Sequence, residues 1–127
     1  MSATQARLQN VASGLLMMSE SDYPFEYFTT QATTIDEHLA LTLAGKPEGT
    51  LVEKTTLDFL LRNLTDPASG SVSPADAQKF RQLAATLTQE LNELTVYRVG
   101  AVQVDVFIIG RTAEGEIAGM RTKLIET

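Results

Sequence analysis

The chain has 127 residues, a formal net charge of −6, 43% hydrophobic residues and 20% charged residues. This length and composition predict one globular domain, 1–127, and exclude a disordered chain, which would be poorer in hydrophobic residues. The chain has no cysteine, which excludes disulfides and metal sites built from thiolates.

The negative charge is concentrated in the N-terminal half of the chain. The first 60 residues hold eight acidic and three basic residues, whereas residues 96–127 hold four of each. This distribution favours basic protein partners over direct binding to nucleic acid, whose phosphates it would repel. No apolar run reaches the roughly 18 residues of a membrane span, and the N-terminus lacks the basic-then-apolar layout of a signal peptide. We therefore predict a cytoplasmic protein with no membrane association.

The first 30 residues predict a helix followed by a strand. Apolar residues recur at helical spacing and would form one buried face: Leu8, Val11, Ala12 and Leu15. Ser2 or Thr4 would cap the start of this helix, and Gly14 would end it. Residues 23–30 are rich in aromatic residues and threonine, which predicts a β-strand.

Residues 31–72 are the hardest part of the chain to interpret. Residues 39–44, LALTLA, alternate like a strand, and residues 45–50 have the composition of a loop. Thr55 followed by Asp58 resembles a capping box ahead of a short helix. The apolar face of that helix would consist of Leu57, Leu60, Leu61 and Leu64.

The clearest helix signal begins at Ser73. Ser73 is a favoured N-cap, Pro74 a favoured first helical residue, and Asp76 an acid in the first turn. An apolar stripe then continues to residue 94: Ala77, Phe80, Ala84, Leu87, Leu91 and Leu94. The stripe lasts less than three heptads, so we expect packing against a sheet rather than a coiled coil.

From Thr95 the apolar period changes from 3.6 to 2. One face of the predicted strand would carry Val102, Val104, Val106 and Ile108. Residues 107–109 are apolar on both faces, which predicts a strand entering the covered middle of a sheet. Residues 112–115, Thr-Ala-Glu-Gly, predict a hairpin turn. The return strand would place Ala118, Met120 and Leu124 on one face, with Arg121, a possible partner for Asp105, and Lys123 on the other. Together these elements predict an α+β fold in which helices cover an antiparallel sheet.

An apolar run and an aromatic run enclose a short acidic loop in residues 14–28, GLLMMSESDYPFEYF. Glu20 and Asp22 lie in the loop, and Pro24 restricts the preceding residue to extended conformations. The flanking side chains can fix both ends of the loop in a core: Met17, Met18, Tyr23, Phe25, Tyr27 and Phe28. We interpret the loop as a rigid, negatively charged recognition device.

Motifs of known enzymes are absent from the sequence. His38 is the only histidine, which excludes a histidine-rich metal site, and there is no GxSxG, P-loop or dinucleotide-binding motif. Glu20, Asp22 and Glu26 offer oxygen ligands for Ca²⁺ or Mg²⁺, but they lack the spacing and glycine of an EF-hand. We therefore expect no catalytic residues, no cofactor and no metal ion of the protein's own.

Two blocks of the chain, residues 12–28 and 96–127, resemble the nuclease A inhibitor family. Members of this family are small bacterial proteins that block sugar-non-specific DNA/RNA endonucleases. The blocks cover 49 of 127 residues without gaps, while residues 29–78 match poorly. The resemblance implies an α+β fold of the PR-1-like type, an α/β/α sandwich in which helices lie on the faces of an antiparallel sheet.

The resemblance also implies how the protein would act. In the family, an acid of a Ser-Glu-Ser loop enters the nuclease cleft in place of the scissile phosphate, and the terminal threonine reaches the catalytic cation. These positions correspond to Glu20, between Ser19 and Ser21, and to Thr127. Asp22 would help to steer the association, and Tyr23 would pack at the contact or anchor the loop. The partner would be a metal-dependent, non-specific endonuclease, and the inhibitor a monomer.

Two other functions stay open at this point. A protein-interaction module of the same fold could bind a different basic partner, because the poorly matching residues 29–78 could reshape the contact surface. A small hydrolase could use Glu20 and His38, in which case the protein would turn over a substrate. By themselves, Glu20 could be a solvated loop acid and Thr127 an ordinary chain end.

Overall fold

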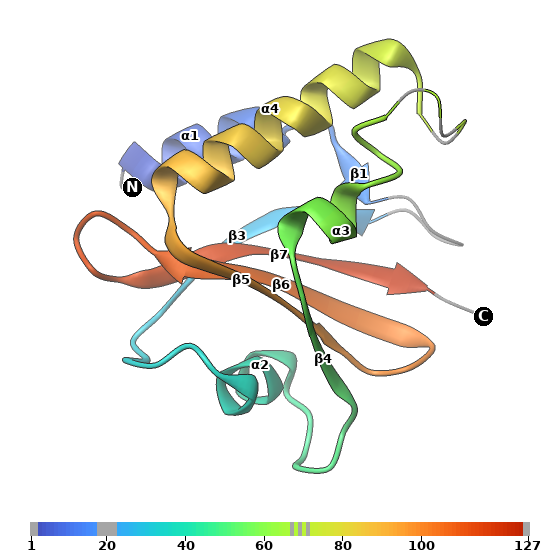
Figure 1. The fold of residues 1–127 in the computed structure, drawn as a ribbon. Coiled ribbons are helices and arrows are strands. Elements are labelled where there is room, and N and C mark those ends of the chain that lie inside the picture. The colour runs from blue at the N-terminus through green and yellow to red at the C-terminus, as the bar shows by residue number, and fades with distance from the viewer. Residues whose placement is uncertain (1–2, 18–22, 67, 69, 71, 126–127) are drawn as a thin grey trace.

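A computed structural model describes residues 3–17, 23–66, 68, 70 and 72–125. The described residues form four helices and seven strands (Figure 1). In chain order, these elements are α1 (Ala3–Ala12), β1 (Leu16–Met17), β2 (Tyr23–Pro24), β3 (Glu26–Thr30), α2 (Glu37–Ala44), β4 (Val52–Thr55), α3 (Leu57–Leu61), α4 (Pro74–Glu90), β5 (Asn92–Val99), β6 (Gln103–Arg111) and β7 (Ile117–Ile125). The predicted α+β class is confirmed.

A five-stranded antiparallel sheet in the order β3-β7-β6-β5-β4 organises the fold. The apolar strand β6 lies at its centre, as its two-sided apolar sequence predicts, and the turn at residues 112–115 connects it to β7. The predicted inward position of Val102 is wrong. Val102 lies exposed in the turn between β5 and β6, because Gly100 ends the ladder before it.

Helices α1 and α4 lie over one face of the sheet (Figure 1). Phe80, Leu83 and Leu87 of α4 are fully buried and pack in one cluster with Val106 and Ile108 of β6. The predicted start of α4 is confirmed, since the Ser73 hydroxyl accepts a hydrogen bond from the Asp76 backbone N–H at 3.1 Å. This is the larger of the two apolar clusters in the described residues.

The predicted end of this helix is wrong by four residues. The helix ends at Glu90, and Leu91 is already extended, with φ −123° and ψ 131°. Leu94 belongs to β5, where a register shift follows Asn92 and Glu93 has a φ of 56°. Leu91 and Leu94 still reach the same apolar cluster, which is why the stripe continues in the sequence beyond the helix.

The opposite face of the sheet is covered by α2 (Figure 1). Its buried residues Leu39, Ala40 and Leu41 pack against Tyr97 and Phe107. The strand predicted for residues 39–44 is therefore wrong. Caps at both ends favour the helix: the Asp36 carboxylate accepts a hydrogen bond from the Leu39 N–H at 2.8 Å, and Gly45 has a left-handed φ of 68°.

Smaller differences concern the ends of elements. Thr4 is buried inside α1 and does not cap it, and Thr56, not Thr55, caps α3 by accepting a hydrogen bond from Phe59 N–H. Thr55 instead ends β4, an edge strand that the sequence pattern did not predict. The strand predicted for residues 23–30 is divided into β2 and β3 at the buried Phe25.

Candidate functional site

A short hairpin holds both ends of the acidic loop. Met17 pairs with Tyr23, and Leu16 pairs with Pro24, in the antiparallel ladder of β1 and β2. Five residues, 18–22, therefore connect two paired positions. The site residues predicted there, Ser19, Glu20, Ser21 and Asp22, lie outside the described residues, and so does Thr127.

Four of the predicted anchors of this loop pack in the apolar clusters, whereas Tyr23 belongs to neither cluster. Met17 and Phe25 are buried in the large apolar cluster, and Tyr27 packs against it. The Phe25 ring meets the Phe80 ring of α4 edge to face, with 6.3 Å between ring centroids. Phe28 faces the other side of the sheet, where its ring lies 6.0 Å from that of Phe107. Met17 and Phe25 thus anchor the hairpin on one face of the sheet, while Phe28 anchors the following strand β3 on the other face.

Tyr23 is the predicted site residue that the structure describes, and it lies against β7. The Thr122 hydroxyl donates a hydrogen bond to the Tyr23 carbonyl at 3.3 Å. The Lys123 Nζ lies 5.9 Å from the centroid of the Tyr23 ring, within the range of a cation–π contact. These contacts fix the residue that directly follows the acidic loop.

The end of β7 lies at the same end of the sheet as this hairpin (Figure 1). Glu26 of β3 pairs with Arg121, and β3 runs antiparallel to β7, so the chain from Glu26 back to Tyr23 leads toward the last residues of β7. Ile125, the last residue of β7, is about 7 Å along the strand from Lys123. We call this end, with Ile125, the turn 100–102 and Leu51, the C-terminal end of the sheet.

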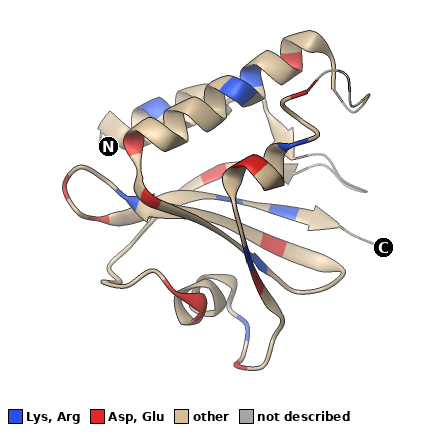
Figure 2. Cartoon of the chain, in the orientation of Figure 1, with Lys and Arg blue, Asp and Glu red and all other residues tan. Residues whose placement is uncertain are grey.

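A charged groove with a volume of about 320 Å³ lies beside Tyr23. Its charged lining comes from paired strand positions, with Glu26 opposite Arg121 and Asp105 opposite Lys123. Acidic and basic positions are therefore neighbours on these strands (Figure 2). Asp105 was predicted as a possible partner of Arg121, but its directly paired residue on β7 is Lys123. The remaining lining residues are Tyr23, Pro24, Leu43, Ala44, Phe107 and Thr122.

The groove was not predictable from the sequence. The sequence pattern places Arg121 and Lys123 on one face of a strand, but the acids opposite them depend on the register of three strands. Leu43 and Ala44 come from α2, which the sequence pattern assigned to a strand. Only the alternation of basic residues along β7 was a signal for the groove.

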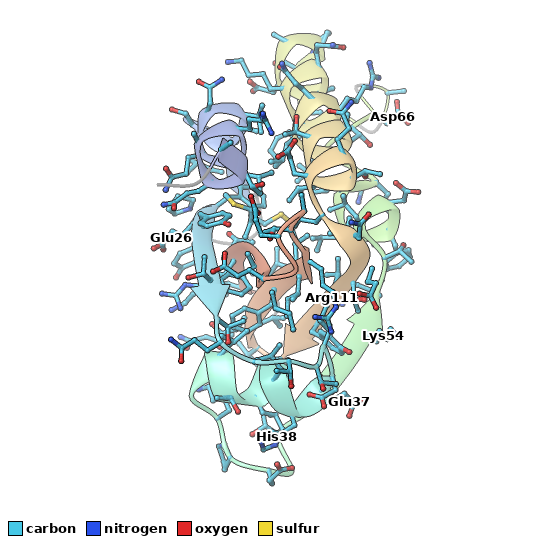
Figure 3. The ribbon with its side chains drawn as sticks, turned by 90° about the vertical axis from the view of Figure 1, so that its left-hand side faces the viewer. Glu26, Glu37, His38, Lys54, Asp66 and Arg111 are labelled. Atoms are coloured by element: carbon cyan, nitrogen blue, oxygen red, sulfur yellow. The ribbon has the colours of Figure 1, made fainter. Side chains whose placement is uncertain are left out.

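His38 lies apart from this region. It is exposed on α2, and its Nδ1 lies 2.9 Å from Glu48 Oε1. Figure 3 places His38 at the outer side of α2 and Glu26 at the sheet edge. Within the described residues, no group of three or more His, Asp or Glu side chains is arranged to hold a metal ion. The contact between His38 and Glu48 is a hydrogen bond on the protein surface.

One described side chain on the α2 face has a shifted pKa. Burial, followed by the negative charges of Asp36 and Glu37, raises the pKa of the Tyr97 phenol above its ordinary value of 10.0. Tyr97 packs against α2 residues and is therefore neutral at physiological pH. Its role is structural, since it supports the helix that borders the charged groove.

A comparison with protein families identifies the family of the chain. A family model described as nuclease A inhibitor-like protein matches residues 2–127, and the chain belongs to this family. Members of the family are non-enzymatic inhibitors of nucleases. A comparison with curated proteins found no match. Among the described residues, no helix has both the length and the apolar character needed to span a bilayer.

Proposed function

We propose that this protein inhibits a sugar-non-specific, metal-dependent endonuclease by placing Glu20 and Thr127 in its active site. Membership of the nuclease A inhibitor-like family is the observation that carries the proposal. Glu20 takes the position of the scissile phosphate, with Ser19 and Ser21 beside it. Thr127 approaches the catalytic cation. The cation belongs to the nuclease, so the inhibitor itself requires no cofactor.

The chemistry of both groups suits this role. A carboxylate is an oxygen ligand for hard divalent cations, and it accepts hydrogen bonds from the Arg or Lys side chains that would otherwise bind phosphate. Thr127 offers a hydroxyl and an α-carboxylate on one residue. Glu20 and Thr127 can therefore replace both the charge and the oxygen atoms of a phosphodiester.

The positions of the hairpin and of the end of β7 support the proposal. The paired residues Met17 and Tyr23 restrict the conformations of the five residues between them, which lowers the entropy lost on binding. β7 ends at Ile125, two residues before Thr127, at the same end of the sheet. A partner at this end of the sheet can thus meet both groups at once.

The same proposal extends to the rest of the molecule. Residues 1–127 act as one inhibitory domain, and the helices on the two faces of the sheet form an α/β/α sandwich that carries the site at one end. The net charge of −6 accelerates the encounter with a basic cleft, with Asp22 and Glu26 close to the contact. One monomer binds one nuclease.

The substitution Glu20→Gln tests this function. The neutral amide keeps the shape of the side chain but loses the charge that replaces phosphate, so we expect inhibition to weaken at least about tenfold, or roughly 1.4 kcal/mol. The measurement is the titration of a purified sugar-non-specific endonuclease from the same source, with DNA cleavage as the readout.

Glu114→Gln is the matched control for this experiment. Glu114 is exposed in the turn between β6 and β7, at the opposite end of the sheet, and the substitution changes the net charge equally. The control should inhibit like the wild type. Equal potency of both variants would remove Glu20 from the mechanism, and a wild-type protein that does not inhibit the endonuclease would refute the function.

A further inference from the structure

Exposed apolar side chains gather at the C-terminal end of the sheet. Four large apolar side chains of the described residues are strongly exposed, and three of them border this end: Leu16 (40% exposed), Leu51 (53%) and Val102 (56%). The fourth, Phe59, lies on α3. Single exposed apolar residues are normal on protein surfaces. Here three of them lie at one end of the sheet, the end that carries the hairpin of β1 and β2.

The hydrogen-bond ladder places Leu51 beside Gly100, two residues before Val102. Val52 of β4 pairs with Val99 of β5, and Gly100 N–H donates a hydrogen bond to the Leu51 carbonyl at 2.9 Å. The turn 100–102 then leads into Gln103, which pairs with Ile125 at the end of β7. Three strand spacings separate β7 from β4, which is about 14 Å. Leu51 and Val102 are therefore close enough to the end of β7 for one partner protein to contact all three.

The fold itself does not require apolar residues in this turn. Gly100 is required, because it has a φ of 108° and a Cβ atom there would lie 2.4 Å from the Gln103 carbonyl oxygen. Ala101 and Val102 are exposed, and no comparable backbone conformation requires them. The hairpin turn at the opposite end of the sheet contains two glutamates within residues 112–116, as polar turns commonly do.

A stable interface is also larger than the acidic loop and the last two residues can provide. Stable complexes bury about 800 Å² on each partner and involve about 20–30 residues a side. Residues 18–22 and 126–127 are seven residues and cannot provide this area alone. The centres of such interfaces are apolar and are surrounded by polar residues. Leu51 and Val102 supply apolar area on one side of the proposed charged contact.

We propose that Leu51 and Val102 form an apolar contact with the endonuclease, on its surface next to the active-site cleft. The inference rests on the proposed function and extends it, because it defines a second, uncharged part of the same interface. Glu20 and Thr127 provide charge for the cleft, while Leu51 and Val102 bind the apolar surface beside it. The partner surface is therefore apolar next to a basic, metal-containing cleft.

The double variant Leu51→Ser/Val102→Ser tests the apolar contact. Both side chains are more than half exposed, so the variant should keep its fold, which circular dichroism and thermal unfolding will verify. Removing both apolar side chains from an interface should raise the dissociation constant at least about tenfold. The measurement is titration calorimetry with the purified Mg²⁺-dependent, sugar-non-specific endonuclease from the same source.

A second pair of variants tests the location by steric blocking. Ala101→Arg and Ala113→Arg place the same bulky, charged side chain in exposed hairpin turns at opposite ends of the sheet. Their net charges are equal, so long-range electrostatic effects are matched. We expect Ala101→Arg to bind at least tenfold more weakly than Ala113→Arg.

The outcomes distinguish this inference from the proposed function. Wild-type affinity of the double variant, with equal affinities of the two arginine variants, overturns the apolar contact even if Glu20→Gln weakens inhibition. If the wild-type protein dimerises and the double variant is a monomer with unchanged inhibition, the surface serves self-association and the inference is wrong. No binding of the endonuclease by the wild type refutes the proposed function and the apolar contact together.

Discussion

At the scale of single residues, a substitution of Lys123 tests whether the fixed position of Tyr23 contributes to binding. Its Nζ lies 5.9 Å from the centroid of the Tyr23 ring, and Tyr23 directly follows the acidic loop. A cation–π contact at an exposed position contributes about 0.5–1 kcal/mol. Lys123→Met keeps an apolar stem but loses the cation, so we expect inhibition of the endonuclease to weaken about two- to fivefold in the same cleavage assay.

The electrostatic control is essential here, because removing a cation should by itself favour a basic partner. Lys79→Met makes the same charge change at an exposed position of α4. Lys123→Arg keeps the cation and should retain wild-type inhibition. If Lys123→Met and Lys79→Met inhibit equally well, the contact with Tyr23 does not position the loop.

At the scale of secondary structure, α2 depends on its caps. The Asp36 carboxylate accepts the Leu39 N–H hydrogen bond at 2.8 Å, which an alanine at this position cannot do. Asp36→Ala should therefore lower the free energy of unfolding by about 1 kcal/mol, measured by urea denaturation. Asp36→Asn keeps an acceptor oxygen and should lose much less. A similar loss in both variants would assign the effect to charge rather than to the cap.

The same helix shows what the sequence could not predict. Residues 39–44 fit a strand by alternation and a helix by their caps, and burial against Tyr97 and Phe107 decides between them. The start of α4 was predictable because Ser73, Pro74 and Asp76 act locally. The end of α4 was not, because Leu91 and Leu94 reach the same apolar cluster in either conformation.

The candidate site shows the same division between local and distant information. The apolar anchors around the acidic loop were predictable from the apolar and aromatic runs that flank it, and Met17 and Phe25 are buried as expected. The pairing of Met17 with Tyr23 was not, since strands of two residues are too short to carry a pattern. The groove also depends on strand register and on α2, which no local pattern specifies.

At the scale of the whole molecule, the negative charge is not confined to the proposed contact surface. Residues 96–127, which form most of the sheet's centre, hold four acidic and four basic residues, while the first 60 residues hold the excess of acids. The described acids of that half are distributed over β3, α2, β4, α3 and the intervening loops, where they produce a field around the molecule rather than one contact (Figure 2). Such a field acts on the rate of encounter, whereas close contacts determine how long a complex lasts.

This distribution of charge predicts how salt affects the two rate constants of the complex. Raising the ionic strength from about 0.1 M to 1 M shortens the Debye length from about 10 Å to about 3 Å. The association rate constant should fall about tenfold, because long-range attraction to a basic cleft is screened. The dissociation rate constant should change much less, since buried contacts are screened weakly. Stopped-flow mixing at fixed Mg²⁺ concentration measures both constants, and equal fractional changes in the two would contradict long-range steering.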